Sequence, residues 1–376
     1  MNILIVGAGP AGLYLAYLLK RQDARHRVHV VEQNPPDATF GFGVVFSDRA
    51  LDFLRDDDAD THDLIVPAMQ RWRDLALHHR GQRVVIDGIG FAAIGRLQLL
   101  QLLRQRLQSV GVAPEYGCAL TQPGELRGHD LVVAADGANS FVRRQFEPAF
   151  GTRCELLDNR FVWYGTTQRF DTLSQTFVDT GFGPMNAHHY RYSDTMSTFI
   201  AECDAATWQR AGFASMDEAS TRRVIEAAFS DTLGGHALVA NKSVWRQFPK
   251  ISNRHWSAGP VVLVGDALRT AHFSIGSGTR LAFEDVIALA RALHEQPDVP
   301  TALQAYEVAR RPVVDKLVEA ANLSANWYEH FAAHMQLAPW DLAWSYIQRS
   351  GRVDLDRLAQ VSPQFVAGYR ASRGGR

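Results

Sequence analysis

Hydrophobic residues cluster most clearly in the first 32 positions of the chain. Positions 2–6, Asn-Ile-Leu-Ile-Val, form an apolar run that is typical of a buried strand, and an apolar helical pattern follows at 13–19. A second apolar run at 28–31 indicates another buried strand, which ends at Glu32. The pattern therefore predicts a β–α–β unit at the start of the chain.

Glycines fill the turn between the first strand and the helix. Residues 7–12, Gly-Ala-Gly-Pro-Ala-Gly, have the spacing G-x-G-x-x-G, which in this setting indicates dinucleotide binding; a plain glycine turn is the alternative. We expect Gly7 to allow the tight turn, Gly9 to leave room for a pyrophosphate and Gly12 to let the helix pack on the strand. The helix N-terminus would offer N–H groups and a partial positive charge to the phosphates. Glu32 stands where a carboxylate binds ribose hydroxyls and repels a 2′-phosphate, so the pattern favours FAD or NAD over NADP.

Two later strand patterns also end in acids. The runs at 130–136 and 259–266 are apolar and β-branched, and they finish with Asp136 and Asp266. Ligands of doubly wound sheets bind at the carboxyl ends of the strands, so both aspartates are candidate ligand-binding residues. A loop or helix-capping role is the alternative for each of them.

The rest of the chain alternates between helical and strand patterns. A glycine-spaced apolar loop is expected at 39–48, a pair of strands at 70–79 and 82–87, and a polar tail after 348. Helices are predicted at 49–60, 97–110, 216–229, 279–294, 301–330 and 339–348.

The stretch 159–203 is rich in aromatic and β-branched residues and predicts a sheet inserted between the nucleotide-binding segments. Such a sheet makes a natural cover for a buried substrate site. Its polar and aromatic residues either line that site or form core, and they include His188, His189, Tyr190 and Tyr192.

The predicted fold class is α/β, a Rossmann-like domain that binds FAD or NAD, with an inserted β-rich substrate domain and C-terminal helices. We expect the nucleotide-binding domain to comprise 1–68, 96–158 and 251–300, the substrate domain 69–95 and 159–250, and the C-terminal helical region 301–376.

The composition is that of an ordinary globular protein, with 46% hydrophobic and 21% charged residues in 376 positions. The net charge is −1 and the basic residues are scattered, so no nucleic-acid partner is expected. No apolar run approaches the ~20 residues of a membrane span, and the first strand begins at residue 2, so we expect a cytoplasmic protein without membrane contact. The cysteines, Cys118, Cys154 and Cys203, lack the spacing of a metal site and are expected to be reduced, mostly buried thiols.

Three signals are specific in combination. The glycine turn at 7–12, the pair Asp136-Gly137 and the pair Gly265-Asp266 follow one another as in the class A, single-component FAD monooxygenases, which this chain resembles. The resemblance implies FAD as the cofactor, NADH or NADPH as the electron donor and O₂ as the co-substrate. It also implies hydroxylation of an activated aromatic ring, a small-molecule substrate, through a C4a-hydroperoxyflavin.

The same resemblance implies which residues hold FAD. Asp266 would contact the ribityl and pyrophosphate region, Asp136 would lie near the flavin and nicotinamide paths, and Arg96 would reach the pyrophosphate. The cofactor-binding residues predicted in this way and from the glycine turn are Gly7, Gly9, Ala11, Gly12, Glu32, Arg96, Asp136, Asp266, Gly276, Gly278 and Thr279.

The segment after the last of these motifs departs from the family's pattern. Arg269 occupies the place of a usual histidine, and His272 and Phe273 replace prolines. The glycines that follow and the helix start near Thr279 would still set N–H groups against the anionic ring of a reduced flavin. His272 is expected beside the flavin, either in a catalytic or substrate-orienting role or as a packing histidine.

A closer resemblance covers nearly the whole chain. Segments similar to the salicylyl-CoA 5-hydroxylases and to the monooxygenase half of anthraniloyl-CoA monooxygenase lie at 39–48, 271–279, 306–312 and 362–366. The resemblance implies an aryl-CoA thioester as substrate, hydroxylated at the 5-position. Phe42, in the first of these segments, is a candidate catalytic residue.

Two alternatives stay open. The segments 161–166 and 193–200 are similar to the violacein-pathway hydroxylase, which implies a free, tryptophan-derived indole substrate. An FAD oxidoreductase without oxygen insertion would also suit the fold. If the substrate carries CoA, its phosphates need cations, and one group of arginines either supplies them or forms an exposed strand face. These arginines are Arg71, Arg73, Arg80 and Arg83.

Overall fold

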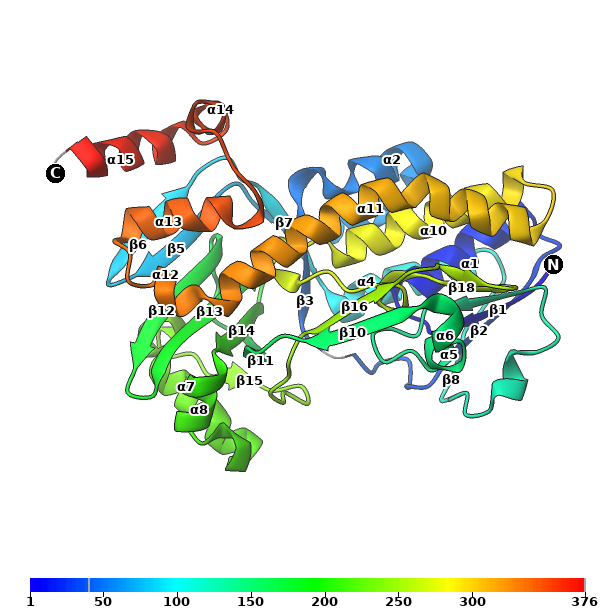
Figure 1. Cartoon of the computed structure of the whole chain (residues 1–376), viewed down its shortest axis with the longest axis horizontal. Coiled ribbons are helices and arrows are strands. Elements are labelled where there is room, and N and C mark those ends of the chain that lie inside the picture. The colour runs from blue at the N-terminus through cyan, green and yellow to red at the C-terminus, as the bar shows by residue number, and fades with distance from the viewer. Residues whose placement is uncertain (40, 375–376) are drawn as a thin grey trace.

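Figure 1 shows the computed structural model, which describes residues 1–39 and 41–374. Two sheets lie toward opposite ends of the molecule, and the N- and C-termini lie at opposite ends as well. The long helix α11 (Val299–Glu329) runs across from the first sheet toward the second. No described helix is long and apolar enough to cross a membrane, and no group of described His, Cys, Asp and Glu side chains could hold a metal ion.

The first sheet, here called the parallel sheet, combines six described strands in the order β17-β18-β9-β1-β2-β8. Its strands are β1 (Asn2–Val6), β2 (Arg27–Glu32), β8 (Glu115–Tyr116), β9 (Leu131–Ala134), β17 (Ser257–Ala258) and β18 (Val261–Leu263). All neighbours run parallel except β17 and β18. Val6 at the end of β1 pairs with Val31 and Ala134. Glu32 and Asp136 therefore lie at one edge, the carboxyl end, where such sheets bind ligands.

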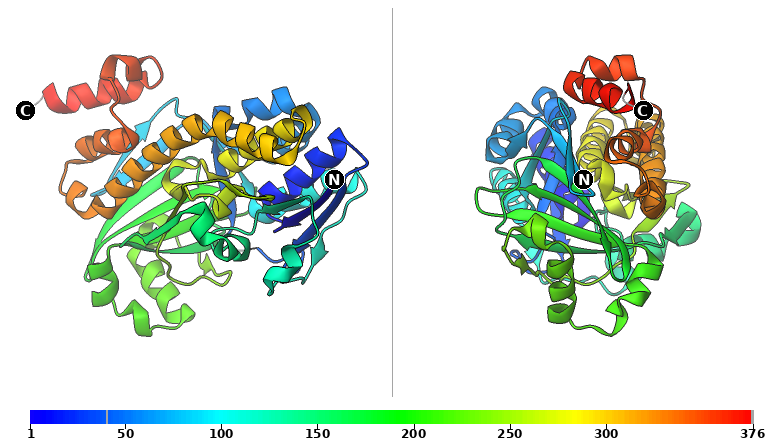
Figure 2. Two further views of the ribbon diagram at one scale, coloured as in Figure 1. Left: turned by 45° about the vertical axis from the view of Figure 1, so that its right-hand side comes forward. Right: turned by 90° about the vertical axis from the view of Figure 1, so that its left-hand side faces the viewer.

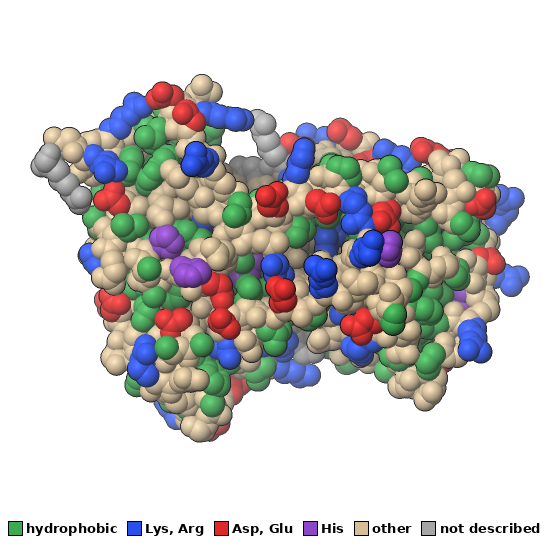
Figure 3. All heavy atoms as spheres, viewed as in Figure 1, with side chains coloured by type: hydrophobic (Ala, Val, Ile, Leu, Met, Phe, Trp, Pro, Cys, Tyr) green, Lys and Arg blue, Asp and Glu red, His purple; other side chains and the backbone are tan. Residues whose placement is uncertain are grey.

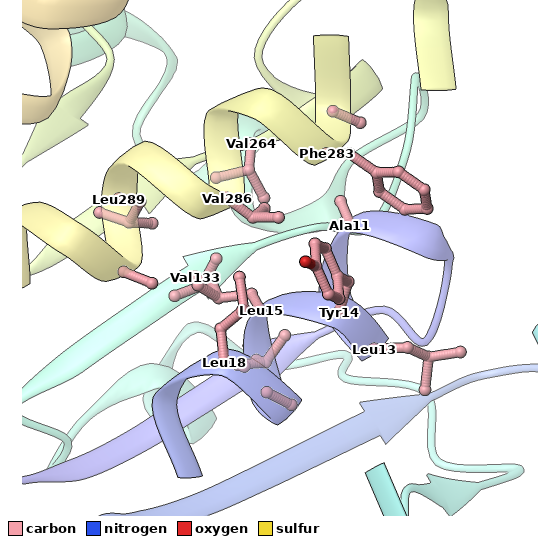
Figure 4. Close-up of a cluster of buried hydrophobic side chains, with 14 of the residues drawn as sticks. Ala11, Leu13, Tyr14, Leu15, Leu18, Val133, Val264, Phe283, Val286 and Leu289 are labelled. Atoms are coloured by element: carbon pink, nitrogen blue, oxygen red, sulfur yellow. The ribbon is translucent and has the colours of Figure 1, made fainter. Parts of the chain in front are cut away.

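Helix α1 (Pro10–Gln22) packs against α10 (Gly278–Glu295) and α4 (Arg96–Gln108), over the parallel sheet. Figure 4 shows Leu15 and Leu18 of α1 meeting Val133 of β9 and Val286 and Leu289 of α10. These side chains are at most 2% exposed, and burying each one contributes roughly 1.5–3 kcal/mol. The β–α–β unit predicted at the start of the chain is confirmed, because its apolar runs are this core.

The second sheet, here called the mixed sheet, combines seven described strands in the order β15-β11-β14-β13-β12-β5-β6. Its strands are β5 (Leu75–His79), β6 (Gln82–Ile86), β11 (Arg160–Thr166), β12 (Leu173–Thr180), β13 (Gly183–Arg191), β14 (Ser197–Cys203) and β15 (Leu238–Val239). Neighbours run antiparallel except β12 and β5, which run parallel. The sheet predicted from the aromatic stretch at 159–203 is confirmed, and the hairpin β5–β6 extends it.

Two smaller pairings connect the ends of the molecule. β3 (Gly43–Ser47) and β4 (Gln70–Trp72) both pair with β7 (Phe91–Gly95), and β10 (Thr152–Leu156) pairs with β16 (Pro249–Asn253). The prediction of a loop over all of 39–48 was therefore wrong, because 43–47 finds a strand partner 50 residues away that the local pattern does not reveal. The strand predicted at 70–79 divides for the same reason, since β4 and β5 join different sheets.

The helix predicted at 49–60 is broken into shorter turns, because Asp58 ends one helix and caps the next through a hydrogen bond from Thr61 N–H. The other predicted helices are present. The remaining helices of the described chain are η1 (Asp48–Leu51), α2 (Asp52–Asp57), α3 (Ala59–Ile65), η2 (Val66–Ala68), η3 (Pro123–Leu126), α5 (Phe141–Gln145), α6 (Glu147–Phe150), α7 (Ala205–Arg210), η4 (Phe213–Ser215), α8 (Glu218–Ala228), α9 (Ser230–Leu233), η5 (Gly265–Ala267), η6 (Phe273–Ile275), α12 (Phe331–His334), α13 (Pro339–Ile347), η7 (Gln348–Ser350), α14 (Leu355–Ala359) and α15 (Pro363–Gly374).

The prediction of a polar tail after residue 348 was wrong. Figure 2 shows the last two helices, α14 and α15, packed at the end of the molecule that holds the mixed sheet. Phe365, Val366 and Tyr369 lie on one face of α15 and are at most 3% exposed. The N–H of Phe365 donates a hydrogen bond of 2.8 Å to the Asp87 carboxylate, which follows β6. The pattern of three apolar residues within one turn and a half was too short to stand out among polar neighbours.

Figure 3 shows acidic and basic side chains interspersed over the face in view, without a field of one sign. The cysteines are free, but only Cys203 among them is buried, whereas Cys118 is half-buried and Cys154 is exposed. The expectation of mostly buried thiols was therefore wrong, because Cys154 lies on the solvent-facing β10.

Candidate functional site

Gly7 and Gly12 are fixed by contacts within the protein. Gly7 has a φ of +105°, and a Cβ there would lie 2.4 Å from the Ala135 carbonyl oxygen. A Cβ at Gly12 would lie 2.0 Å from the carbonyl oxygen of Gly7. Gly9 differs, because a Cβ there would meet no described atom within 4 Å and its φ of −73° suits any residue. The fold itself does not require glycine at Gly9, which is the behaviour expected where a ligand approaches the backbone.

Two helix N-termini face one cavity. The first helical hydrogen bond of α1 runs from the Leu13 N–H to the Gly9 carbonyl oxygen. The N–H groups of Ala11 and Gly12 therefore have no helical partner. Helix α10 begins at Gly278, and no described side chain caps it. Residues from both N-termini line a cavity of about 320 Å³. Such an arrangement binds anionic groups, because unpaired N–H groups and positive helix ends converge there.

Arg96 and Asp266 bring opposite charges to this cavity. Arg96 is the first residue of α4, and Asp266 lies in the turn η5 that follows β18. The Asp266 carboxyl is accessible from the cavity, but surrounding protein keeps it from bulk water and raises its pKa, against which Arg96 and Arg269 act. Burial also lowers the pKa of the Arg96 guanidinium, with Asp266 opposing that change. The two side chains thus favour each other's ionised form.

Glu32 and Asp136 lie at the same edge of the parallel sheet but are engaged with the protein backbone. The Glu32 carboxylate accepts hydrogen bonds of 2.9 Å from the N–H groups of Ala8 and Asn34. The Asp136 Oδ2 accepts one of 3.1 Å from the N–H of Val142, which supports α5. Its Oδ1 is buried without a partner in the described chain. Burial raises the pKa of Asp136, and these hydrogen bonds lower it. The contact with Val142 is the helix-capping role that was the alternative for Asp136. The Oδ1 atom remains a buried acceptor without a hydrogen-bond donor in the described chain.

The mixed sheet closes the other end of the cavity. Alternate residues of β11 and β13 project one aromatic face toward it, so that Phe161, Trp163, His188 and Tyr190 line the cavity. Phe248, Phe273, Tyr346 and Arg349 come to the same lining from connecting segments and from the C-terminal region. One cavity therefore joins an anion-binding end on the parallel sheet to an aromatic end under the mixed sheet.

Comparison with known proteins identifies the family. Residues 110–321 match the FAD binding domain family, and residues 5–37 match the NAD(P)-binding Rossmann-like domain family. The chain is 41% identical over 361 residues to a salicyloyl-CoA 5-hydroxylase of Streptomyces sp, which covers 93% of this chain and 70% of that protein. It is 39% identical over 328 residues to a 3-hydroxy-4-methyl-anthranilyl-(aryl-carrier protein) 5-monooxygenase of Streptosporangium sibiricum, covering 87% and 89% of the two chains. This chain belongs to the FAD-dependent aromatic monooxygenases.

A third relative and a solved structure agree with this family. The protodeoxyviolaceinate monooxygenase of Chromobacterium violaceum is 34% identical over 360 residues, which cover 93% of this chain and 94% of that one. A solved structure of 2-methyl-3-hydroxypyridine-5-carboxylic acid oxygenase has the same fold, with a TM-score of 0.72 at 18% identity over 88% of this chain and 92% of that one. The predicted family resemblance, the α/β fold class and the assignment as a flavoprotein monooxygenase are confirmed.

The residues present in this monooxygenase fit FAD. The open space beside Gly9 recurs at Gly278, where a Cβ would also meet no described atom within 4 Å. Both glycines lie at helix N-termini that line the cavity, and Arg96 adds a cation there. Gly276 and Thr279 line the same wall. Most of the predicted cofactor residues are therefore brought together at the cavity, whereas four of them lie next to the lining rather than in it, namely Gly7, Gly12, Glu32 and Asp136.

The two predicted catalytic residues lie behind the cavity wall. His272 is 4% exposed, and its Nδ1 lies 2.8 Å from the Ser274 Oγ. Its ring packs against the rings of Phe248 and Phe273, which do line the cavity. Burial lowers the pKa of His272 to about 4, so the imidazole is neutral at neutral pH. This geometry favours the packing alternative for His272.

Phe42 supports the mixed sheet rather than facing the cavity. A Cβ at Gly165 would lie 2.6 Å from the Phe42 ring, so this ring covers the backbone of β11. The preceding Gly41 lies against the Trp163 indole, where a Cβ would be 3.2 Å from three ring atoms. This glycine-spaced segment thus lies against a flat side chain of the protein itself.

The candidate CoA-binding arginines are exposed side chains on and beside the strands β4, β5 and β6. Arg80, at the β5–β6 hairpin, donates a hydrogen bond of 3.0 Å to the Met335 carbonyl oxygen. The exposed-strand alternative accounts for this group.

Sequence reasoning missed three polar groups in or directly behind the cavity wall. Gln175 and Arg349 line it, and Glu202 lies directly behind His188. The alternation of residues along β13 was enough to place His188 and Tyr190 on one face. No local signal marks Arg349, because the segment that carries it reaches the cavity only through the packing of α13 on the mixed sheet.

Proposed function

We propose that this monooxygenase hydroxylates position 5 of a benzoyl thioester that carries a hydroxyl or amino group at position 2, such as salicyloyl-CoA. Reduced nicotinamide, NADH or NADPH, is the electron donor and O₂ the co-substrate. Two relatives support this proposal, and the match covers most of the length of each. Both are named for position 5 and for an aromatic acyl group on a carrier.

One observation carries the proposal: the cavity joins two unpaired helix N-termini to an aromatic face. The α1 N-terminus, with Gly9 and Ala11, and Arg96 would hold the pyrophosphate, and Glu32 would bind the ribose. Asp136 and Asp266 would hold the remaining polar groups of the cofactor. Gly276, Gly278 and Thr279 would direct N–H groups toward the flavin end. FAD supplies the chemistry that takes a hydride from the nicotinamide and activates O₂.

The aromatic end of the cavity would hold the substrate ring. Phe161, Trp163 and Phe273 supply apolar surface, so a planar ring is desolvated when it enters. His272 positions Phe273 through the packing described above, and Phe42 positions β11. We therefore propose positioning roles for these two residues.

The test is a panel of substrates with the purified, FAD-loaded protein. NADH and NADPH oxidation would be measured with salicyloyl-CoA, 2-aminobenzoyl-CoA and free salicylate, and products would be followed by mass. We expect one of the thioesters to stimulate oxidation and to gain one oxygen, with free salicylate much less effective. No response to any thioester in a protein with intact flavin would refute the proposed substrate.

A second candidate substrate is a free, tryptophan-derived indole, which the 34% identical protodeoxyviolaceinate monooxygenase favours. Adding such an indole acid to the same panel separates the two candidates. An oxidoreductase without oxygen insertion gains no support, since all three relatives are named as hydroxylases or monooxygenases.

A further inference from the structure

A buried carboxylate fixes a histidine at the aromatic end of the cavity. His188 on β13 lines the cavity, and its Nε2 lies 3.3 Å from Oε2 of Glu202 on β14. Glu202 is 2% exposed, and its Oε1 accepts a hydrogen bond of 2.8 Å from Asn159 Nδ2. Burial raises the pKa of Glu202, but the hydrogen bonds from His188 and Asn159 and the nearby imidazoles outweigh burial and leave the pKa below its usual range. Glu202 is therefore an ionised group with both oxygens engaged.

This contact decides which nitrogen of His188 is left for a ligand. A carboxylate only accepts hydrogen bonds, so Nε2 of His188 carries the proton that it donates to Glu202. In this Nε2–H tautomer Nδ1 carries the lone pair, and no described residue bonds to it. Gln175 stands directly opposite His188 in the β12–β13 register, and its Oε1 is buried without a partner in the described chain. This part of the cavity wall is thus suited to a ligand that donates a hydrogen bond.

A guanidinium stands at the same end of the cavity. Arg349 lines it from η7, and its Nη1 and Nη2 donate to the carbonyl oxygens of Tyr346 and Ser274 at 2.9 and 3.2 Å. Its Nε is buried and bonds to no acceptor in the described residues. The guanidinium stacks 3.8 Å from the centre of the Tyr346 ring. No described carboxylate forms an ion pair with Arg349, so its charge and its free N–H remain available to a ligand acceptor.

The two polar groups are neighbours through shared aromatic rings. The His188 ring lies 4.8 Å from the Tyr328 ring and 5.2 Å from the Phe273 ring, centre to centre. The Tyr328 ring lies 6.5 Å from the Tyr346 ring, on which Arg349 stacks. His188 and Arg349 therefore belong to one aromatic cluster at this end of the cavity.

We propose that His188, held by Glu202, and Arg349 form a two-point subsite for an aromatic ring that carries a hydrogen-bond donor next to a carbonyl oxygen. The donor, a hydroxyl or amine, bonds to His188 Nδ1, and the carbonyl oxygen bonds to Arg349. This inference rests on the proposed function, since it names the groups that would recognise the substrate. It adds that the ring substituents, rather than the carrier, set the orientation.

Two contacts on one planar ring fix its rotation within the plane. In a 2-hydroxybenzoyl or 2-aminobenzoyl group the two contacted substituents are adjacent, and position 5 lies opposite the donor. When both substituents are held at His188 and Arg349, positions 4 and 5 are the ring carbons turned away from them, and of these two position 5 is the one para to the activating donor. The subsite therefore gives a physical reason for selection of one position.

The test measures binding to the oxidised, FAD-loaded protein with three small probes that carry no thioester. Salicylamide has both groups, benzamide lacks the hydroxyl, and phenol lacks the carbonyl. Dissociation constants would be taken from the change in the flavin absorbance spectrum. In the wild type we expect salicylamide to bind about tenfold more tightly than either single-group probe, since each hydrogen bond contributes independently.

Two variants separate the two contacts. Glu202→Gln keeps the shape but lets the amide donate to Nε2, so His188 is no longer held in one tautomer. This variant should weaken the binding of salicylamide about tenfold and leave the binding of benzamide nearly unchanged. Arg349→Gln should weaken the binding of salicylamide and benzamide about tenfold and leave the binding of phenol nearly unchanged. His78→Gln in the mixed sheet and Arg352→Gln on the surface are matched controls that should change none of the three.

Equal weakening of all three probes by either variant would assign that residue a structural role and overturn the subsite. Failure of the wild type to prefer salicylamide would overturn it as well. Thioester turnover is a separate readout. If thioesters fail as substrates while the binding pattern holds, the proposed substrate is wrong and the subsite stands; if thioesters react without the binding pattern, the subsite is wrong.

Discussion

The backbone N–H of Arg96 donates a hydrogen bond of 2.7 Å to the carbonyl oxygen of Phe42. This bond ties the first residue of α4, at the anion-binding end of the cavity, to the loop whose Phe42 ring covers β11 in the mixed sheet. The two ends of the cavity are therefore joined by one short stretch of backbone.

Removing the Phe42 ring should loosen this junction without removing FAD. Phe42→Ala uncovers the backbone of Gly165 and should lower the free energy of unfolding by roughly 1–3 kcal/mol, because the ring is only partly buried. Urea unfolding and flavin content measure the two effects, and Phe42→Leu should lose less stability. Lost turnover at unchanged stability would instead give the ring a direct catalytic role.

Alanine substitutions at Gly9 and Gly12 should have different effects, one on FAD binding and the other on stability. Gly9→Ala meets no described atom, so the apoprotein should unfold like the wild type but bind FAD at least about tenfold more weakly. Gly12→Ala places a Cβ 2.0 Å from the Gly7 carbonyl oxygen and should destabilise the apoprotein itself. Thermal unfolding of apoprotein and FAD titration separate the two. Normal FAD affinity in Gly9→Ala would contradict the assigned pyrophosphate position.

His272 should make stability depend on pH in the acid range. Its folded pKa, lowered by burial to about 4, lies below the usual value of 6.5, so the unfolded chain binds the proton first. Stability contributed by the neutral ring is present above pH 6.5 and is lost as the pH falls toward 4, by about 3 kcal/mol at most. Urea unfolding from pH 7 to 4 should give a shallower decline in His272→Asn than in the wild type. Parallel curves would show that the ring is not buried as described.

Asp266 should be needed for FAD retention. Asp266→Asn keeps the shape but removes the negative charge that interacts with Arg96 and Arg269, so Arg96 loses a compensating charge, whereas Arg269 keeps its ion pair with Asp285. We expect FAD to dissociate at least about tenfold more readily. Asp231→Asn, an exposed acid on α9, is the matched control. Full flavin content in purified Asp266→Asn would contradict the role given to this residue.

Sequence reasoning was strongest where the chemistry is local. The glycine turn, the apolar strands and the acids that end them are each set by a short continuous segment, and strand and helix periods reveal them directly. Gly7 and Gly12 are examples, because their steric need comes from the same short turn. The aromatic sheet was also predictable, since its strands share one composition.

Contacts between distant segments could not be predicted in this way. Arg349 reaches the cavity from a segment 75 residues after Ser274, to which it is bonded. Glu202 acts only through His188, and its role depends on the β13–β14 register. His272 illustrates the converse, since its position in the sequence suggests the cavity, whereas its side chain turns into the protein. Side-chain direction and register are tertiary properties that a single sequence pattern does not encode.

The proposed function is oxygen insertion into the ring of an aryl thioester at position 5. The most direct measurement is turnover of salicyloyl-CoA with NADH or NADPH under ¹⁸O₂, with the product analysed by mass spectrometry and NMR. We predict a product with one ¹⁸O atom, bound at position 5. A product without the label, or nicotinamide oxidation that yields only hydrogen peroxide with this thioester and with 2-aminobenzoyl-CoA, would contradict the claim.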